Sequence, residues 1–463
     1  MFTTEVLHEL IKVLGKENVL SEKEDLVTYS YDATAAVPSV EPDVVVTPTS
    51  TEHVVEIVKI ANRYKIPIYP RGSGTNLSGG AIPIKKGIVL TTQKMNKILE
   101  LDADNLTAMV QPGVIIQDLN NEAVKHGLIY PPDPGTVSTA TMGGSVSECS
   151  GGLRGLKYGV TKHYIMGMEL VLANGDVIKW GGKTVKNVSG YDLTALFTGA
   201  EGTLGIITKL LVKLIPAPEA RKSLLAVFDD LDKAGNAISD IIRNKVIPAT
   251  LEIMDKVTIG TVENFTHAGL PTDAEAVLLI EVDGYKEVVE REAPVVERVC
   301  RENGAVDIKV AKTDQERDLI WFARRNALPS LAQVKPALVL EDATVPRSKI
   351  PNVIKEIRRI AEKYNLMIGT YGHAGDGNLH PTIVIDPRDQ DEVHRMEQAV
   401  DEIFKAAISL EGTLSGEHGI GIGKVKYLPL EFGEAGVNTI RRIKEALDPN
   451  YLLNPGKMVT KEE

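Results

Sequence analysis

The chain has 463 residues, beyond the size at which a single hydrophobic core stops growing, so we expect at least two domains. Its 52 Lys and Arg residues against 63 Asp and Glu residues give a net charge of −11, which argues against a partner with a phosphate backbone, such as nucleic acid. The two cysteines, Cys149 and Cys300, exclude a disulfide framework and a four-thiolate metal site.

The N-terminal residues MFTTEVLHELIKVLG predict an amphipathic helix and lack the apolar centre of a signal peptide. No stretch reaches the roughly 18 apolar residues that a membrane-spanning helix needs. We therefore expect a cytoplasmic protein without a transmembrane segment, which reaches a membrane only through a partner and is able to form a homo-oligomer.

From residue 44 onward, strand and helix patterns alternate. VVV predicts a strand, Ser50 and Thr51 cap a helix with apolar spacing, and a short strand leads into a glycine-rich loop. A helix over IIQDLNNEAVKHG and a hairpin with Asn174-Gly175 at its turn follow. We expect this first domain, residues 1–219, to close near the prolines of IPAPEA.

The next segments, from SLLAVF to AVDIKV, follow the order β-α-β-β-α-β of a ferredoxin-like unit. A polar helix over 313–332, a strand near 338–340 and a further helix precede the strands MIGTY and PTIVI, which flank a histidine loop. After a long helix over 389–410, the chain ends in a small C-terminal segment. We expect a second domain over 220–412 and this segment over 413–463, in an α+β protein.

Three glycine-rich stretches lie within the expected first domain. PRGSGTNLSGG, residues 70–80, places four glycines and three hydroxyl side chains in eleven positions directly after a strand. Glycines let backbone N–H groups surround an anion such as a pyrophosphate. The stretch matches neither GxGxxG nor the P-loop. Two more stretches, over 131–159 and 197–208, make simple surface turns a poor explanation.

Two later motifs contain metal-binding side chains. GHAGDGNLH carries His373 and His380, and SGEHGIG carries Glu417 and His418. Two imidazoles and one carboxylate suit zinc, iron or manganese and leave coordination positions open. His418 is then a candidate general base beside a metal-polarised hydroxyl group. The alternative is that each histidine is merely solvated or hydrogen-bonded.

Arg324 lies on the helix-like IWFARRNALPSL, where a guanidinium could bind a carboxylate in a bidentate manner. The alternative is a solvated arginine, since Arg325 is its neighbour. Cys149, among glycines, is better interpreted as a small buried residue than as a reactive thiol.

Together, PRGSGTNLSGG, PPDPGT, TMGGSVSECSGG, LKYG, TGAEGTLGIIT, WFARRNA, GHAGDGNLH, SGEHGIG and NPGK resemble, in order, the FAD-linked 2-hydroxyacid dehydrogenases of the vanillyl-alcohol-oxidase superfamily, in the branch that acts on glycolate and D-lactate. The resemblance runs from about residue 40 to the end of the chain. It implies an FAD-binding domain of the vanillyl-alcohol-oxidase type, a ferredoxin-like cap domain for substrate and metal, and a C-terminal segment that returns to the flavin.

The resemblance also implies the site residues. Non-covalent FAD would contact the three glycine-rich stretches and the NPGK motif, at Pro70, Arg71, Gly72, Ser73, Gly74, Thr75, Asn76, Ser78, Pro134, Gly135, Thr136, Gly143, Gly144, Ser147, Gly202, Ile207 and Asn454. A divalent metal would be held by His373, His380 and Glu417. His418 would be the base, and Arg324 would bind the substrate carboxylate.

The implied reaction oxidises a short D-2-hydroxy acid, D-lactate or glycolate, to the 2-oxo acid, with hydride transfer to N5 of the flavin. The electrons would pass to a partner, an iron–sulfur subunit or an electron-transferring flavoprotein, because two cysteines cannot hold a cluster. Three departures from the family pattern refine these expectations. Ser145 and Cys149 replace asparagines of many relatives, and residues 70–80 contain no histidine that could link FAD covalently. Leu328 stands in place of a residue that helps hold a second carboxylate, which favours a short substrate.

Other functions remain open from the sequence. A metal-dependent hydrolase or a non-haem iron oxygenase could use the same His-His-Glu set without a flavin. A dehydrogenase of the D-2-hydroxyglutarate type would take a larger substrate, and a flavin-binding subunit kept for assembly would have no activity.

Overall fold

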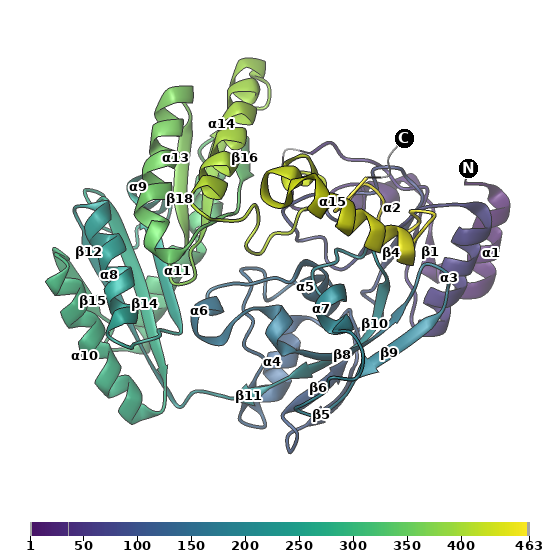
Figure 1. Cartoon of the computed structure of the whole chain (residues 1–463), viewed down its shortest axis with the longest axis horizontal. Helices are drawn as coiled ribbons and strands as arrows, with labels where there is room; N and C mark the ends of the chain where they lie inside the picture. The colour runs from purple at the N-terminus through teal and green to yellow at the C-terminus, as the bar shows by residue number, and fades with distance from the viewer. Residues whose placement is uncertain (1, 36, 461–463) are drawn as a thin grey trace. The chain divides into compact units, whose positions relative to one another are not determined.

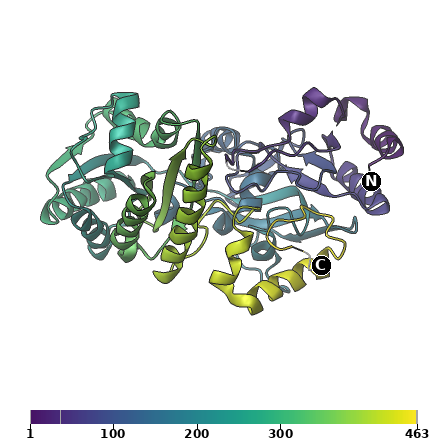
Figure 2. The ribbon, with the colours of Figure 1, turned by 90° about the horizontal axis from the view of Figure 1, so that it is seen from above.

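The computed structural model describes residues 2–35 and 37–460. The chain divides into two compact units. The first unit comprises Met1–Ser150, Val160–Pro216 and Glu417–Glu463, and the second comprises Gly151–Gly159 and Ala217–Gly416. Residues 151–159 therefore cluster with the second unit, although they lie inside the range 1–219 that we expected to form the first domain. Figure 2 shows the purple N-terminal and yellow C-terminal residues, which both belong to the first unit.

The first unit contains a four-stranded sheet in the order β1-β2-β4-β3. Its strands are β1 (Val19–Leu20), β2 (Val44–Val46), β4 (Ile88–Thr91) and β3 (Ile68–Arg71). β4 is parallel to both β2 and β3, so both strands need crossover connections. The crossover between β2 and β3 contains α3 (Thr51–Tyr64), which begins where the Ser50 hydroxyl accepts the His53 N–H, as the capping pattern predicted.

A second, antiparallel sheet in this unit has the order β5-β6-β10-β8-β9. Its strands are β5 (Ile98–Asp102), β6 (Thr107–Val110), β10 (Ile206–Lys213), β8 (Ile165–Val171) and β9 (Val177–Gly181). The apolar side chains of α3 share one core with the four-stranded sheet, with α1 (Thr4–Leu14), and with Val171 and Ile206 of the second sheet. α3 therefore packs its apolar face against residues of both sheets.

The first unit also contains the short helices α2 (Lys23–Thr28), α4 (Ile116–Val124), α5 (Met142–Glu148) and α7 (Leu193–Phe197), the long helix α15 (Leu428–Leu447), and the small pair β7 (Leu128–Ile129) and β11 (Ile215–Pro216). The C-terminal segment adds to the edge of the first sheet, because the Ile68 N–H donates to the Leu452 carbonyl at 2.8 Å. The yellow trace that follows α15 in Figure 1 is this segment.

The second unit is built on one sheet in the order β15-β12-β14-β13-β18-β19-β16, with the short strand β17 (Ala343–Thr344) paired to β19. The first four strands of this order are β15 (Asp307–Val310), β12 (Ala220–Phe228), β14 (Ala276–Gly284) and β13 (Thr250–Asp255). In sequence they are the fourth, first, third and second strands of the unit, so the fourth lies beside the first, and the third lies between the first and the second. That antiparallel order is the ferredoxin-like one, so the prediction is confirmed. β18 (Met367–His373), β19 (Asn378–Ile385) and β16 (Ala337–Leu340) extend the sheet beyond β13.

Helices cover both faces of this sheet (Figure 1). One face carries α8 (Leu231–Arg243), α10 (Lys286–Glu302), α13 (Ile350–Tyr364) and α14 (Gln390–Ser409), which pack on one another and on the strands. The other face carries α9 (Lys256–Thr266), α11 (Asp314–Arg325) and α12 (Ala327–Leu331), which share a core with Met254, Tyr371 and Val384.

The structure differs from the expected elements at three places. Residues 256–266 form α9, which we did not predict. The helix expected over 313–332 is two helices, α11 and α12, because Pro329 has no N–H for the Arg325 carbonyl and the helical ladder ends there. The expected histidine loop is a tight β18–β19 hairpin in which His373 ends one strand and His380 lies inside the other.

Candidate active site

The glycine-rich loop after β3 forms a backbone cradle in the first unit. Gly74 and Gly79 have φ values of +72° and +78°, a region where a side chain is strained. The Ser73 hydroxyl donates to the Thr139 carbonyl at 2.5 Å and so connects this loop to the second glycine-rich stretch. The Arg71 guanidinium, by contrast, donates to the Tyr31 carbonyl at 2.7 Å, so part of its hydrogen-bonding capacity is used within the protein.

The second stretch passes through Pro134, Gly135 and Thr136 into α5. The Thr141 hydroxyl accepts the Gly144 N–H at 3.2 Å and caps the helix, while Gly143 packs so closely on Pro112 that a Cβ would lie 2.6 Å from it. At Gly135, in contrast, no atom lies within 4 Å of the position of a Cβ. A ligand could therefore approach the backbone closely at Gly135.

The third stretch and the C-terminal motif meet the first loop. Asn454 donates from its amide nitrogen to the Gly80 carbonyl at 3.0 Å and to the Glu201 carbonyl at 2.7 Å. Gly202 has φ +66°, and a Cβ there would lie 3.2 Å from Pro70. Asn454 thus holds two loops that are far apart in sequence against each other.

These residues fit a bound FAD. Within residues 2–35 and 37–460, the buried Nδ2 of Asn76 and Oδ1 of Asn454 have no hydrogen-bond partner. One is a donor and the other an acceptor, and such groups are rarely buried without a ligand or water to satisfy them. They accompany the open backbone at Gly135 and the glycine cradle, so the polar groups and the backbone of these loops fit a dinucleotide.

The sequence analysis missed Glu201, which holds the SGEHGIG motif on the first unit. Its buried carboxylate accepts the N–H groups of Ile420 at 2.6 Å and Gly421 at 2.8 Å. Burial raises the pKa of Glu201 above its ordinary value, while these two N–H donors act in the opposite direction. The only indication in the sequence was one acidic residue inside a glycine-rich run.

The backbone around His418 is also fixed by the glycine loop. The Ser78 hydroxyl donates to the His418 carbonyl at 2.9 Å, and the Ser78 carbonyl accepts the Ile422 N–H at 2.9 Å. The imidazole Nε2 of His418 lies 3.6 Å from Oε1 of Glu417. The candidate base is therefore attached to the same loop that we expected to contact FAD.

In the second unit, the hairpin of β18 and β19 brings His373 and His380 together. His380 pairs with Tyr371, and His373 lies two residues after Tyr371, so all three side chains project from one face of the sheet. Both histidines are buried, their ring centroids are 5.1 Å apart, and each offers a ring nitrogen within 4.8 Å of the other. The chemistry of this donor pair fits a metal ion.

A buried carboxylate that we did not predict, Glu252 of β13, contacts both His373 and Arg324. Its Oε1 lies 2.7 Å from Nδ1 of His373, and its Oε2 accepts the Nε–H of Arg324 at 2.7 Å and lies 2.6 Å from Nη2 in an ion pair. Burial alone raises the pKa of Glu252, but the adjacent His373 and Arg324 outweigh it and hold the pKa below its ordinary value. Arg324 is itself buried, with its guanidinium 4.9 Å from the centre of the Tyr371 ring.

A second unpredicted carboxylate, Asp342, lies beside His380. Its Oδ1 is 3.9 Å from Nδ1 of His380 and accepts the Asn378 amide at 2.5 Å, while its Oδ2 accepts the Ser415 hydroxyl at 2.6 Å. Asp342 is fully buried. It therefore fixes the position of Ser415, two residues before Glu417, near His380.

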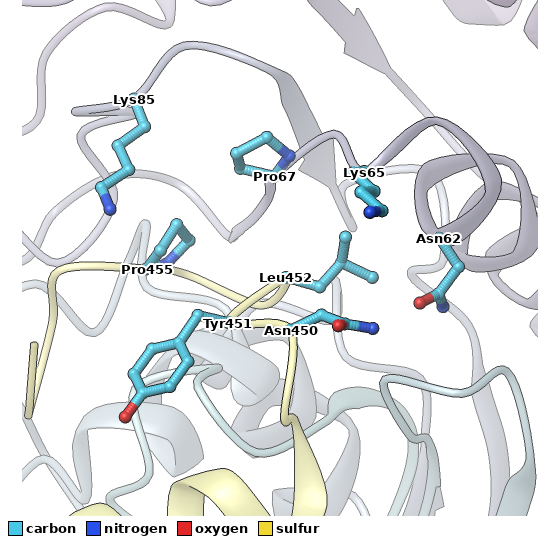
Figure 3. A pocket seen from close by; sticks show the side chains of 8 residues that line it. All are labelled: Asn62, Lys65, Pro67, Lys85, Asn450, Tyr451, Leu452 and Pro455. Atoms are coloured by element: carbon cyan, nitrogen blue, oxygen red, sulfur yellow. The ribbon is translucent and has the colours of Figure 1, made fainter. Parts of the chain in front are cut away.

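The structure also places Cys149 and Leu328, two other residues considered in the sequence. Cys149 caps α5 in a left-handed conformation, and burial raises its thiol pKa, which does not suit a reactive thiolate. Leu328 packs from α12 against the core of the second unit. A hollow of about 340 Å³ in the first unit, shown in Figure 3, is lined by other residues, namely Asn62, Lys65, Pro67, Lys85, Asn450, Tyr451, Leu452 and Pro455.

Comparison with known proteins defines the class. Residues 217–458 match the C-terminal domain of FAD linked oxidases, and residues 42–181 match an FAD binding domain. The chain belongs to this family and is an FAD-dependent oxidoreductase, as the resemblance implied. The hydrolase and oxygenase alternatives assumed a protein without a flavin, and the family of FAD linked oxidases contradicts that assumption.

Particular relatives are similar over nearly their whole length. The chain is 51% identical to the glycolate oxidase subunit GlcD of Bacillus subtilis, over 100% of this chain and 98% of that protein. It is 38% identical to the D-lactate dehydrogenase of Archaeoglobus fulgidus, over 94% of this chain and 96% of that protein. Among solved structures, p-cresol methylhydroxylase superposes with a TM-score of 0.83 at 22% identity, covering 99% of this chain and 96% of that one, which confirms the fold. No helix within the described residues is long and apolar enough to cross a membrane.

Proposed function

We propose that the chain oxidises a short D-2-hydroxy acid, D-lactate or glycolate, to the corresponding 2-oxo acid. The observation that carries the proposal is the buried pair His373 and His380 beside Arg324, in a chain of the FAD-linked oxidase family. An imidazole pair suits a metal that binds a hydroxyl group, and a guanidinium suits a carboxylate. The names of the two relatives, glycolate oxidase and D-lactate dehydrogenase, support this substrate class.

We assign a divalent metal, zinc, iron or manganese, to His373, His380 and Glu417. The chain supports Glu417 as the third ligand, because Ser415 is bonded to Asp342 beside His380 and two further residues span at most about 7 Å. When bound, the metal lowers the pKa of a coordinated hydroxyl group.

His418 would take the hydroxyl proton on its imidazole, as a neutral histidine can do near pH 7. A bound FAD would supply the acceptor for the hydride of the substrate carbon. Arg324 donates its Nε–H to Glu252, and the N–H groups on its two Nη atoms would serve the substrate carboxylate. For FAD itself, we assign the predicted residues of the glycine-rich stretches and Asn454.

The electrons would leave to a partner protein, an iron–sulfur subunit or an electron-transferring flavoprotein. The chain has only Cys149 and Cys300, which cannot hold a cluster. The word subunit in the name of the Bacillus subtilis relative supports an assembly.

An anaerobic absorption spectrum tests the proposal. D-Lactate or glycolate, added separately from L-lactate, should bleach the flavin band of the metal-loaded protein. His418→Ala should keep the FAD band and lose the bleaching by about a hundredfold or more in rate, because the base is removed. Bleaching of His418→Ala at the wild-type rate would exclude His418 as the base, and a wild-type band that no short hydroxy acid bleaches would overturn the substrate class.

A further inference from the structure

Glu252 links the two halves of the candidate site through one carboxylate. It is fully buried on β13, with one oxygen on His373 and the other on Arg324. In the proposed function, His373 binds the metal and Arg324 binds the substrate carboxylate. A single side chain therefore contacts a group from each function.

The contact with His373 determines which nitrogen of the ring is available. Because an ionised carboxylate only accepts, Nδ1 at 2.7 Å from Oε1 is the nitrogen that donates the hydrogen bond, and Nε2 is the ring nitrogen left for a metal. A carboxylate behind a histidine in this way orients the ring and raises its basicity as a ligand. The contact with Arg324 is a charge-assisted hydrogen bond from Nε, with Nη2 2.6 Å from the same oxygen, so it also orients the guanidinium.

From these contacts we propose that Glu252 is a positioning residue that couples metal binding to recognition of the substrate carboxylate. The inference rests on the proposed function. The negative charge of Glu252 balances the positive charge of Arg324. The guanidinium therefore selects the substrate by the direction of its N–H groups rather than by net charge. A change at Glu252 must then disturb both binding events, and a change at Arg324 must be felt at the metal.

Stability alone does not account for this charge. Glu252 stands on a buried strand between Leu251 and Ile253, and replacing a buried ion pair by well-packed apolar side chains is often neutral or stabilising. The strand does not need a carboxylate to pair with β14 and β18.

Asp342 supplies a matched control. It is also a fully buried carboxylate on the Nδ1 side of a histidine, at 3.9 Å from His380. Asp342 accepts hydrogen bonds from Asn378 and Ser415, whereas the Arg324 guanidinium donates to Glu252. Asp342 should therefore affect metal binding only.

The test uses FAD-loaded wild type, Glu252→Gln and Asp342→Asn. The Mn²⁺ dissociation constant is measured by competition with a chelating dye, and KM and kcat for D-lactate are measured at saturating Mn²⁺. Glu252→Gln should weaken Mn²⁺ binding by about 10–100-fold and also raise KM by about tenfold. Asp342→Asn should weaken Mn²⁺ binding while KM at saturating Mn²⁺ stays at the wild-type value.

A wild-type KM in Glu252→Gln at saturating Mn²⁺, or unchanged Mn²⁺ binding, would overturn the coupling. A wild-type protein that binds Mn²⁺ but oxidises no short hydroxy acid would instead count against the proposed function alone. Should Glu252→Gln not fold, Arg324→Lys serves as the second variant, since its Mn²⁺ dissociation constant should change by about fivefold although residue 324 is not a ligand. An unchanged constant in Arg324→Lys would also overturn the coupling.

Discussion

At the scale of single residues, three buried carboxylates contact the candidate site residues or the backbone beside them. Glu252 and Asp342 each face Nδ1 of one histidine, and Glu201 holds the backbone after His418. The spacing of the histidine motif made His373 and His380 candidate metal ligands, and the resemblance to the family implied the role of Arg324. Glu252 and Asp342 could not be predicted, because each lies in an ordinary strand or turn far from its partner in sequence.

Lys457, in the NPGK motif, allows a prediction at the same scale. Lys457 is 1% exposed, and its ammonium group donates to the Ile82 carbonyl at 2.5 Å and lies 4.7 Å from the centre of the Tyr69 ring. Burial lowers the pKa of Lys457 to about 7, although Asp32 and Glu201 oppose the shift. Below pH 7 Lys457 is protonated in both the folded and the unfolded chain. The free-energy cost of burying its charge then lowers the stability of the folded chain in full.

Above pH 7 the folded chain releases that proton while the unfolded chain keeps it, so the cost falls as the pH rises towards the ordinary value of 10.5. Lys457→Met should therefore raise the free energy of unfolding relative to wild type more at pH 6 than at pH 9.5, as measured by urea denaturation with saturating FAD. Lys85→Met, at an exposed lysine, is the control and should give no such difference. An equal effect of Lys457→Met at both pH values would contradict the lowered pKa.

At the scale of elements, the β18–β19 hairpin decides where the histidines lie. Its turn depends on Gly377, which has φ +90° and approaches Val345 so closely that a Cβ would be 1.9 Å from the carbonyl oxygen. The pairing of Tyr371 with His380 then sets both histidines on one face. The sequence predicted the two strands and the turn but not this register, which depends on the position of the turn.

Gly377→Ala should lower the free energy of unfolding by at least about 2 kcal/mol, because it combines a strained φ with a steric clash. It should also weaken Mn²⁺ binding by displacing the histidines. Gly260→Ala is the matched control, since Gly260 lies in α9 with no neighbouring atom within 4 Å of its Cβ position. This variant should raise the free energy of unfolding by up to about 1 kcal/mol. Chemical denaturation compares the three proteins, and equal stability of Gly377→Ala and wild type would refute the assignment of strain.

The other differences at this scale have local causes. Residues 256–266 are rich in β-branched side chains and contain Gly260, so their helix propensity is low. The Asp255 carboxylate accepts the Thr258 N–H at 2.9 Å, and packing against β13 and β18 supplies the remaining stability of α9. Tertiary contacts thus override the propensity.

At the scale of the whole molecule, the chain visits each unit more than once. Residues 151–159 leave the first unit and belong to the second, where the Tyr158 hydroxyl donates to the Asp283 carboxylate at 2.8 Å. Glu417 begins the final return to the first unit, whereas His373 and His380 belong to the second. The residues proposed for FAD therefore lie in the first unit, and the two histidines do not.

Hydrogen exchange on the whole chain should reflect this division. Removing FAD should speed exchange in residues 72–80, since at 100 times its Kd a ligand adds about 2.7 kcal/mol to the state that binds it. Chelation of the metal should instead speed exchange in β18 and β19, and His380→Ala should show no response to the chelator. The same protection pattern before and after chelation of the wild type would contradict a metal on the hairpin.

The sequence by itself determined the family, the α+β class, the ferredoxin-like strand order and the candidate ligands. These follow from local patterns: glycines where backbone must approach a ligand, alternation in strands, and side chains with specific chemistry in compact motifs. Only the tertiary structure decided that Glu252 joins His373 to Arg324, that Asp342 lies by His380 and that Glu201 holds the loop after His418. Such contacts join residues from distant segments, and their partners are selected by strand register and burial, which no local pattern encodes.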